Sequence, residues 1–263
     1  MPIGAFEREV LRLLAANRNP DSFVGGATVL HQSPQSPRSS RDVDFFHDAM
    51  ENLSASADAD VRVLRQAGFI VDAEPEHQTF RHAIVRRGDQ QTKIEWVVDS
   101  AFRFFPVEPD PELGWRLNFW DAATNKVLAL AGRSEIRDLI DVLYLHQHHL
   151  HLGALAWAAV GKDPGFTPES IITWMRRHAV FRPDDLAAVI TNEPLFLPAL
   201  KEQWLNESES ALELIRRLPL EHAGCLYLNA NGVPVTPEPN RAGFAQLTRH
   251  FGSLKGALPR VVS

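Results

Sequence analysis

Two aspartates spaced two residues apart are the strongest chemical signal in this 263-residue sequence. Asp42 and Asp44 lie in residues 41–46, which alternate polar and apolar side chains as a half-buried strand does. Alternate side chains of a strand point the same way, so both carboxylates share one face about 6.6 Å apart. Their repulsion would be relieved by a cation, and paired Mg²⁺ ions serve phosphoryl and nucleotidyl chemistry in this way. The alternative is an Asp-x-Asp pair on a solvated strand face.

A third carboxylate is expected from a neighbouring hairpin. Residues 81–86 and 92–98 have strand patterns, and residues 88–91 between them favour a turn. Glu95 and Asp99 lie on the same face of the second strand. Glu95 is the more central of the two, so we expect it to complete the site.

A glycine pair upstream predicts a phosphate-binding turn. Phe23-Val24 has the pattern of a short strand, Gly25-Gly26 of a tight turn, and a helix is expected from Ala27. The free N–H groups of a helix N-terminus attract phosphates. This order of elements places such N–H groups beside the two aspartates. The alternative is a glycine turn with no ligand.

A second group of charged residues follows later in the chain. Lys126, Arg133 and Arg137 would form one stripe of a continuous helix, at roughly 100° per residue, and could contact a triphosphate. A helix break at the glycine before Arg133 would remove this stripe and leave only Arg137 related to Asp138 and Asp141. The alternative is a solvated face on which Arg137 and Asp141 form an i,i+4 ion pair.

The elements expected around these residues divide the chain into an α+β first part and a helical second part. Helical periodicity is seen in residues 6–16 and 57–67, and then in five later runs, 122–130, 134–147, 170–178, 183–190 and 199–218. Asn231-Gly232 predicts one small hairpin within residues 225–236. We therefore expect a core over residues 1–115 and a mainly helical domain over residues 116–263.

Composition narrows the class of protein. With 44% hydrophobic and 23% charged residues the chain has a globular composition, and no run approaches the roughly 18 apolar residues of a membrane span. Charges interrupt the apolar residues among the first 17, so we expect no secretory signal, and the single Cys225 suits a reducing compartment. We expect a cytoplasmic protein without a membrane partner. A net charge of −6 argues against a uniformly basic nucleic-acid surface but allows a local basic site.

Two further groups of residues are expected to be structural. The histidines at 146, 148, 149 and 151 lie at a predicted helix end with no carboxylate or cysteine nearby in the sequence to complete a metal site. The six tryptophans are scattered, so we expect packing rather than a base-stacking platform.

Together these residues resemble the AbiE-type abortive-infection toxin nucleotidyltransferases, a branch of the DNA polymerase β-like superfamily. The matching residues are Gly25-Gly26-x-x-x-Leu30, Arg38-x-Ser40-x-Asp42-x-Asp44, Lys126 with Arg133, and Arg137-Asp138-x-x-Asp141. The resemblance spans about the first 145 residues, and it favours the strand Lys93-Ile94-Glu95 for the third carboxylate.

The resemblance implies a mixed-sheet nucleotidyltransferase core and an enzyme that uses Mg²⁺, expected as two ions, and a nucleoside triphosphate. It assigns metal binding to Asp42, Asp44 and Glu95, and a catalytic contribution to these and to Asp138. Nucleotide binding is assigned to Gly25, Gly26, Arg38, Ser40, Lys126, Arg133 and Arg137.

The resemblance also implies an acceptor hydroxyl, which in some members belongs to tRNA, and a toxin silenced by an antitoxin protein. Two alternatives remain open from the sequence. The acceptor could be a protein hydroxyl or a small molecule such as an aminoglycoside. The chain could instead be a non-catalytic nucleotide-binding module or an antitoxin partner with the same fold.

Overall fold

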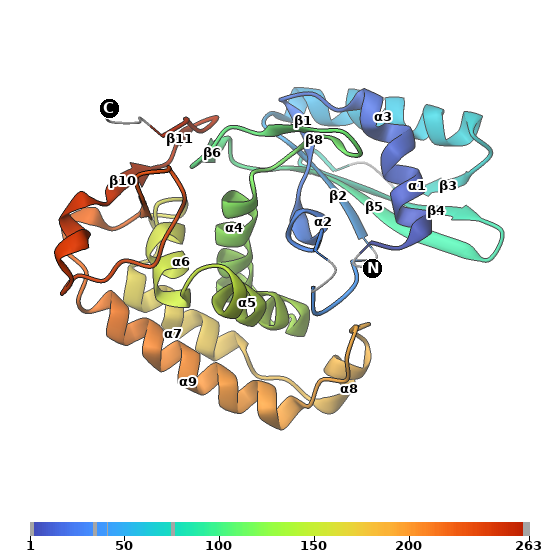
Figure 1. Cartoon of the computed structure of the whole chain (residues 1–263). Coiled ribbons are helices and arrows are strands. Elements are labelled where there is room, and N and C mark those ends of the chain that lie inside the picture. Colours follow the sequence, from blue (N-terminus) through green and yellow to red (C-terminus); the bar gives the residue numbers. More distant parts are fainter. Residues whose placement is uncertain (1–2, 34–35, 41, 75–76, 260–263) are drawn as a thin grey trace. The chain divides into compact units, whose positions relative to one another are not determined.

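The computed structural model describes residues 3–33, 36–40, 42–74 and 77–259, which divide into two compact units (Figure 1). The first unit comprises residues 1–101 and 106–122, and the second comprises residues 102–105 and 123–263. Arg41, expected at the start of the Asp42 strand, lies outside the described residues. No helix in the described ranges is long and apolar enough to cross a membrane. The domain boundary expected after residue 115 stays a prediction.

A seven-stranded mixed sheet organises the first unit. Its strands are β1 (Ser22–Val24), β2 (Asp42–His47), β3 (Ile70–Ala73), β4 (Phe80–Arg87), β5 (Gln90–Val98), β7 (Glu108–Asp110) and β8 (Gly114–Arg116). They run in the order β3-β4-β5-β2-β1-β8-β7. Strand β2 is parallel to β5 and β1 is parallel to β8, while the other neighbours are antiparallel. The expected mixed sheet is confirmed.

The β4–β5 hairpin is tighter than the expected four-residue turn. Arg87 pairs with Gln90, so Gly88 and Asp89 alone form the connection. Gly88 has a φ of +59°, which favours glycine over other residues. The ladder therefore extends further along both strands than the sequence pattern predicted.

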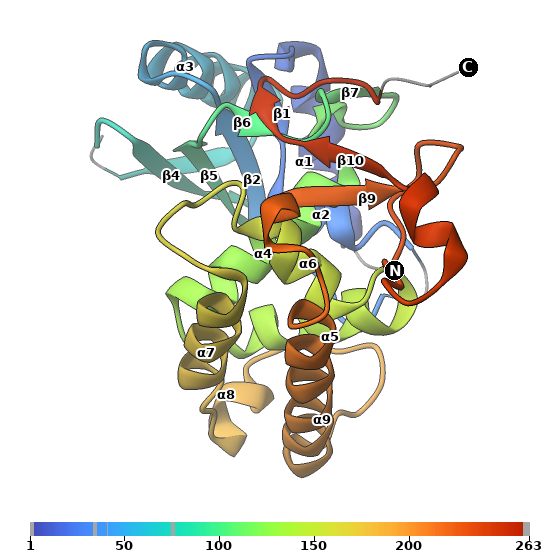
Figure 2. The ribbon, with the colours of Figure 1, turned by 90° about the vertical axis from the view of Figure 1, so that its left-hand side faces the viewer.

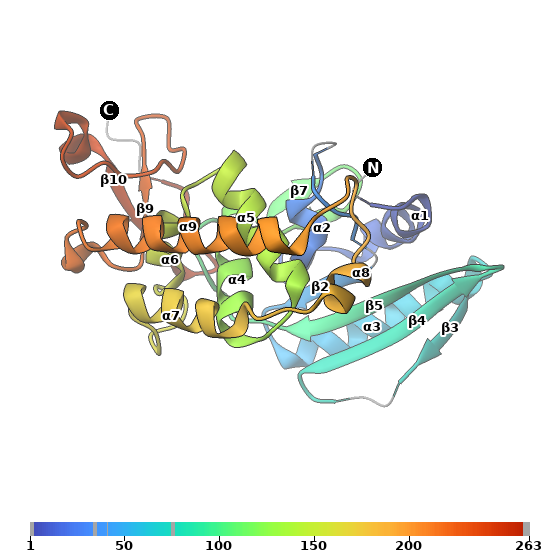
Figure 3. The ribbon, with the colours of Figure 1, turned by 90° about the horizontal axis from the view of Figure 1, so that it is seen from below.

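Helices cover both faces of this sheet. The helices of the first unit are α1 (Ala5–Leu14), α2 (Gly26–Leu30) and α3 (Met50–Gln66), and a short 3-10 helix, Ala15–Asn17, follows α1. Helices α1 and α3 pack together on the β2–β5 strands, and α3 lies behind β3, β4 and β5 when viewed from below (Figure 3). Helix α2 contacts β2. Helix α3 begins at Met50 rather than near Ala57, because Leu53 extends its buried stripe by one turn.

The second unit is mainly helical (Figure 2). Its elements are α4 (Phe119–Gly132, which begins in the first unit), α5 (Ile136–His148), α6 (Leu152–Ala159), α7 (Pro168–His178), α8 (Pro183–Ala187), α9 (Leu197–Ile215), 3-10 helices Leu220–His222 and Ala242–Gln246, and strands β6 (Phe102–Arg103), β9 (Cys225–Leu228), β10 (Thr248–Phe251) and β11 (Ser253–Leu254). Helix α6 packs on α9 and α7, and β9 pairs with β10.

Two features of the second unit differ from the sequence prediction. Helix α6 was not expected, because every residue in it is buried and an all-apolar segment shows no amphipathic period. The chain does turn at Asn229, whose N–H donates to the Val233 carbonyl over 3.0 Å. The predicted hairpin is limited to one bridge, Leu228 opposite Pro234, beside which the Val235 N–H donates to the Tyr227 carbonyl over 2.9 Å. The longer ladder of β9 is formed with the later β10.

Candidate active site

The two aspartates lie on the half-buried face of β2. Val43 and Phe45 are fully buried on the opposite face, so the predicted alternation of this strand is confirmed. The Ser40 hydroxyl donates to the Asp42 carbonyl over 3.1 Å and fixes the start of the strand. Asp42 and Asp44 are therefore held on one face by regular strand geometry, and both residues are partly exposed.

Glu95 lies beside Asp44 on the neighbouring strand. In the parallel β2–β5 ladder, Asp44 pairs with Glu95 and Asp42 pairs with Lys93. The Glu95 carboxylate forms an ion pair with the Lys93 ammonium. Among the described residues, no three His, Cys, Asp or Glu side chains are grouped closely enough to hold a metal ion. The sheet thus aligns the backbones of Asp44 and Glu95, and the Glu95 carboxylate pairs with a cation of the protein.

The glycine turn lies directly on β2, as the order of elements predicted. The Gly25 N–H donates to the Asp44 carbonyl over 2.9 Å. Gly26 has a φ of +60°, and a Cβ added there would lie 1.9 Å from Asp44 Oδ2. A Cβ at Gly25 would lie 2.4 Å from the ring of Phe46. Both positions therefore require glycine, and the turn brings the Gly26 backbone close to the Asp44 carboxylate.

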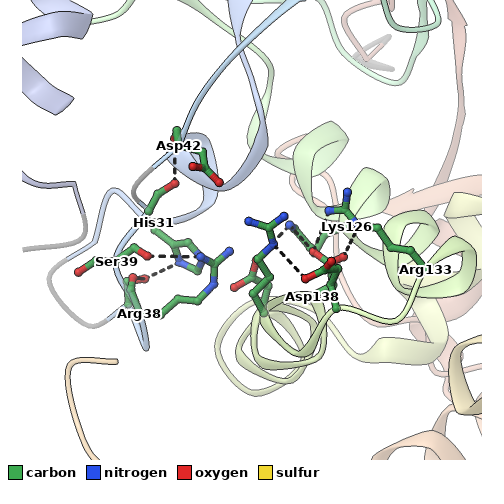
Figure 4. A network of polar contacts seen from close by, with 12 residues as sticks. His31, Arg38, Ser39, Asp42, Lys126, Arg133 and Asp138 are labelled. Atoms are coloured by element: carbon green, nitrogen blue, oxygen red, sulfur yellow. Dashed lines mark hydrogen bonds and ion pairs between the residues drawn. The ribbon is translucent and has the colours of Figure 1, made fainter. Parts of the chain in front are cut away.

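The loop between α2 and β2 buries Arg38. Its guanidinium donates to the Ser39 carbonyl over 3.3 Å, beside His31 (Figure 4). The Ser36 hydroxyl donates to the Arg38 carbonyl over 3.2 Å and also contacts His31 Nδ1. His31 is fully buried. Sequence patterns did not single out His31 or Ser36, because the loop that joins them to Arg38 has no regular period.

The second unit contains its own charged cluster, centred on Asp138. Lys126 Nζ lies 2.8 Å from Asp138 and 3.2 Å from Asp141, and both carboxylates are fully buried. Arg133 Nε lies 2.8 Å from the other oxygen of Asp138, and the Arg133 side chain is 52% exposed. Figure 4 shows Lys126 and Arg133 directed at Asp138 from separate segments. One buried carboxylate therefore orients two cations, of which Arg133 reaches solvent.

The predicted stripe of three cations is wrong. Residues 133–135 separate α4 from α5, so Lys126, Arg133 and Arg137 do not share a continuous helix. Arg137 Nε lies 3.8 Å from Glu135. Asp141, the residue that the alternative pairs with Arg137, lies 3.2 Å from Lys126 Nζ. Tertiary contact with Asp138, rather than helical spacing, brings Lys126 and Arg133 together.

Electrostatics keep Asp138 ionised. Burial alone would raise the pKa of Asp138, but the charges and hydrogen bonds of Lys126 and Arg133 outweigh it and lower this pKa below its ordinary value. An ionised carboxylate with two cationic partners is suited to hold those partners in place. It is poorly suited to accept a proton near neutral pH.

The histidines at the end of α5 have structural contacts. His146 Nδ1 accepts from the Leu152 N–H over 2.9 Å, and its Nε2 lies 2.5 Å from Glu207 of α9. His151 caps α6, because its Nδ1 accepts from the Gly153 N–H over 3.1 Å. The expected helix-end position is confirmed. The carboxylate that contacts His146, Glu207, comes from a distant part of the sequence, so the local sequence gave no signal for it.

Comparison with known proteins gives one family match and several similar folds. The family model described as nucleotidyl transferase AbiEii toxin, type IV TA system, matches residues 12–218. JHP933 from Helicobacter pylori superposes with a TM-score of 0.50 at 16% identity, over 80% of this chain and 91% of that one. MenT4, a nucleotidyltransferase toxin from Mycobacterium tuberculosis, gives 0.54 at 16% identity, over 79% and 82% of the two chains. None of the curated proteins matches this chain.

Proposed function

Since the chain belongs to the AbiEii nucleotidyl transferase toxin family of type IV toxin–antitoxin systems, we propose that it transfers a nucleoside monophosphate from a nucleoside triphosphate to an acceptor hydroxyl, with Mg²⁺. The family match covers most of the chain and establishes the enzyme class, a nucleotidyltransferase. The metal, the acceptor and the residue roles below are our proposal.

One observation carries the assignment of the site. The Gly25-Gly26 turn is hydrogen-bonded to the Asp44 carbonyl, and only a glycine at position 26 leaves room beside Asp44 Oδ2. An ordinary turn would connect these elements equally well without approaching a carboxylate so closely. Packing therefore does not explain the approach. The approach does suit a site in which phosphates bind to peptide N–H groups next to a metal-binding carboxylate.

The residues of this face suit Mg²⁺ as ligands. Asp42 and Asp44 are carboxylates, which Mg²⁺ prefers, and they share one strand face. Glu95 is aligned with Asp44 and would join them by exchanging its Lys93 partner for the metal. When bound, the metal would stabilise the negative charge that develops on the transferred phosphoryl group.

The proposed reaction forms one bond and breaks one. The acceptor oxygen attacks the α-phosphorus, the bond from that phosphorus to the bridging oxygen breaks, and pyrophosphate leaves. Glu95 is our candidate to accept the proton of the acceptor hydroxyl. In the second unit, Lys126 and Arg133 are the candidates for phosphate contacts, because Asp138 orients both cations and Arg133 is accessible to solvent.

RNA, with tRNA first, is the acceptor class that we propose. One surface feature of the second unit supports it. Trp174 is 41% exposed, and the Arg177 guanidinium lies 5.1 Å from its ring centroid. Exposed aromatic rings next to arginine bind unpaired bases and phosphates. This tryptophan does not follow the expectation that the tryptophans serve packing.

Labelled nucleotides test the proposed function. The protein is incubated with each α-labelled triphosphate, Mg²⁺ and total cellular RNA, and parallel reactions contain an aminoglycoside or no acceptor. Transfer predicts label in RNA from the α-position and none from the γ-position. Chelation of metal, or Asp44→Asn, should lower the rate by about a hundredfold or more.

The alternatives give different results in the same assay. Label on the aminoglycoside or on the protein itself would replace RNA with that acceptor. Binding of triphosphate without release of pyrophosphate in any reaction would indicate a non-catalytic module. Full activity of Asp44→Asn would refute the site assignment.

A further inference from the structure

We propose that Arg18 and Asp60, buried behind the sheet, are a positioning pair that holds Asp44 of β2 and Glu95 of β5 in register. The inference rests on the proposed function, because it takes these two carboxylates as the reactive face. Neither residue touches the carboxylates, so both would act through the strands.

Arg18 and Asp60 form a fully buried ion pair. Arg18 Nη2 lies 2.5 Å and 2.6 Å from the two oxygens of Asp60, and both side chains are 0% exposed. Asn17 also donates to Asp60, over 2.8 Å. Asp60 lies on α3 and Arg18 follows α1, so the pair also joins the two helices on this face.

The ion pair contacts one residue on each central strand. Trp96 Nε1 of β5 donates to Asp60 over 2.8 Å. The Arg18 guanidinium lies 4.0 Å from the ring centroid of Phe45 on β2. Phe45 and Trp96 are partners in the parallel ladder, with ring centroids 6.4 Å apart. The pair therefore contacts both strands at a single register position.

That register position is adjacent to the candidate carboxylates. Asp44 pairs with Glu95 one residue before Phe45 pairs with Trp96. Because side chains alternate, Phe45 and Trp96 point to the buried face and the carboxylates to the other. A shift of one residue would exchange the faces. Fixing Phe45 and Trp96 from behind therefore fixes Asp44 and Glu95 in front.

Stability alone gives a weak reason for this pair. Burying two charges costs desolvation energy, and apolar residues of similar volume often replace such pairs without loss of stability. Arg18 Nε and Nη1 are buried and have no hydrogen-bond partner within the described structure. Buried ion pairs can instead serve conformational specificity, and here the contacts select a register.

The test compares two aspartates of the same helix. Asp60→Asn removes the charge of the buried pair. Asp58→Asn removes an ion pair to Arg81 of β4, which has a distance of 2.7 Å and a carboxylate that is 58% exposed. We expect Asp60→Asn to lower kcat about tenfold or more, and to accelerate amide hydrogen exchange in β2 and β5. Asp58→Asn should change neither, and both variants should keep the KM for the triphosphate.

A double variant separates positioning from folding. Arg18→Met combined with Asp60→Leu leaves no unpaired charge, so we expect its melting temperature to lie above that of Asp60→Asn. If the pair positions the strands, kcat stays low although stability rises, because apolar side chains cannot reproduce the hydrogen bond to Trp96. A recovery of kcat to the wild-type value in the double variant would overturn the inference.

The two proposals fail in distinguishable ways. A wild-type protein that transfers no nucleotide refutes the proposed function, and the exchange rates of β2 and β5 still decide whether the pair holds the register. An active wild type together with an unchanged kcat and unchanged exchange in Asp60→Asn refutes the positioning pair alone.

Discussion

Gly26 satisfies two separate requirements, one on its backbone conformation and one on the space beside it. Its φ of +60° is one that other residues adopt at a cost, and its missing Cβ avoids a contact of 1.9 Å with Asp44 Oδ2. An ordinary turn glycine satisfies only the first requirement. The chain provides such a glycine for comparison, since Gly68 has a φ of +83° and no atom within 4 Å of a Cβ built there.

Gly26→Ala and Gly68→Ala separate these requirements. Both should lose about 1–2 kcal/mol of unfolding free energy from backbone strain, measured by urea unfolding. Only Gly26→Ala should also displace the Asp44 carboxylate, so nucleotidyl transfer should fall at least about tenfold. Equal activity of the two variants would show that the turn serves the backbone alone.

Asp138 gives a stability prediction with a defined pH range. Its pKa is lowered in the folded protein by Lys126 and Arg133 against the effect of burial, so its contribution is complete above the ordinary value of 3.8. Its contribution to the unfolding free energy is lost at lower pH, as the pH falls through the folded-state pKa, which lies below 3.8. Asp138→Asn should cost about 3 kcal/mol of unfolding free energy at neutral pH, because Lys126 loses its nearer carboxylate.

Denaturant unfolding of wild type and Asp138→Asn at neutral pH and below pH 3.8 checks this prediction. The difference between them should shrink at the lower pH. Glu135→Gln is the control, since it removes an ion pair to Arg137 whose two side chains are both exposed. A difference that stays constant with pH would mean that Asp138 is not the ionised centre of the cluster.

The start of α6 is held by a histidine, which makes this element sensitive to pH. Burial, followed by the charges of His146 and Arg217, lowers the pKa of His151 from 6.5 to about 4. His151 Nδ1 accepts the Gly153 N–H, which requires the neutral ring. With a lowered pKa, the contribution of His151 to the unfolding free energy is complete above pH 6.5. It is lost as the pH falls through the folded-state value of about 4.

His151→Asn tests the cap of α6. Asparagine also caps helix N-termini but does not titrate, so the variant should lose less stability than wild type between pH 6.5 and pH 4. Thermal unfolding at both pH values measures this difference. His146 and Glu207 lie in the same cluster and remain in both proteins. Parallel pH curves would refute the role of His151.

For the whole molecule, the main question is which surface selects the acceptor. Two pairs of adjacent arginines lie in the second unit, Arg176-Arg177 on α7 and Arg216-Arg217 directly after α9. The structure distinguishes Arg176 from Arg177. Arg176 donates to Glu209 over 2.9 Å, whereas Arg177 stacks on exposed Trp174 and has no carboxylate partner within the described part of the chain.

Arg177→Gln and Arg176→Gln form a matched pair for RNA binding. Arg177→Gln should weaken binding and lower the slope of log affinity against log salt by about 0.7–0.9, the value for one phosphate contact. Arg176→Gln should change the slope less, because its charge is already paired. The affinity for the triphosphate should be the same in both variants. Equal slopes would remove Arg177 from the acceptor surface.

Local patterns determined much of this protein in advance. Strict alternation placed Asp42 and Asp44 on one strand face, and the glycine pair predicted a turn beside them. Both signals depend on neighbours in the sequence, where backbone geometry gives each side chain a direction. The same residues carried the resemblance to the family that the match over residues 12–218 later established.

Tertiary structure alone decided which distant residues meet. Helical spacing suggested a stripe of Lys126, Arg133 and Arg137, but the helix ends between them, and Asp138 gathers the first two. The pairing of Arg18 with Asp60 had no signal in the sequence. Such contacts depend on how elements pack and how strands align, and the free energy that selects them is shared among many buried side chains. No local pattern contains that information.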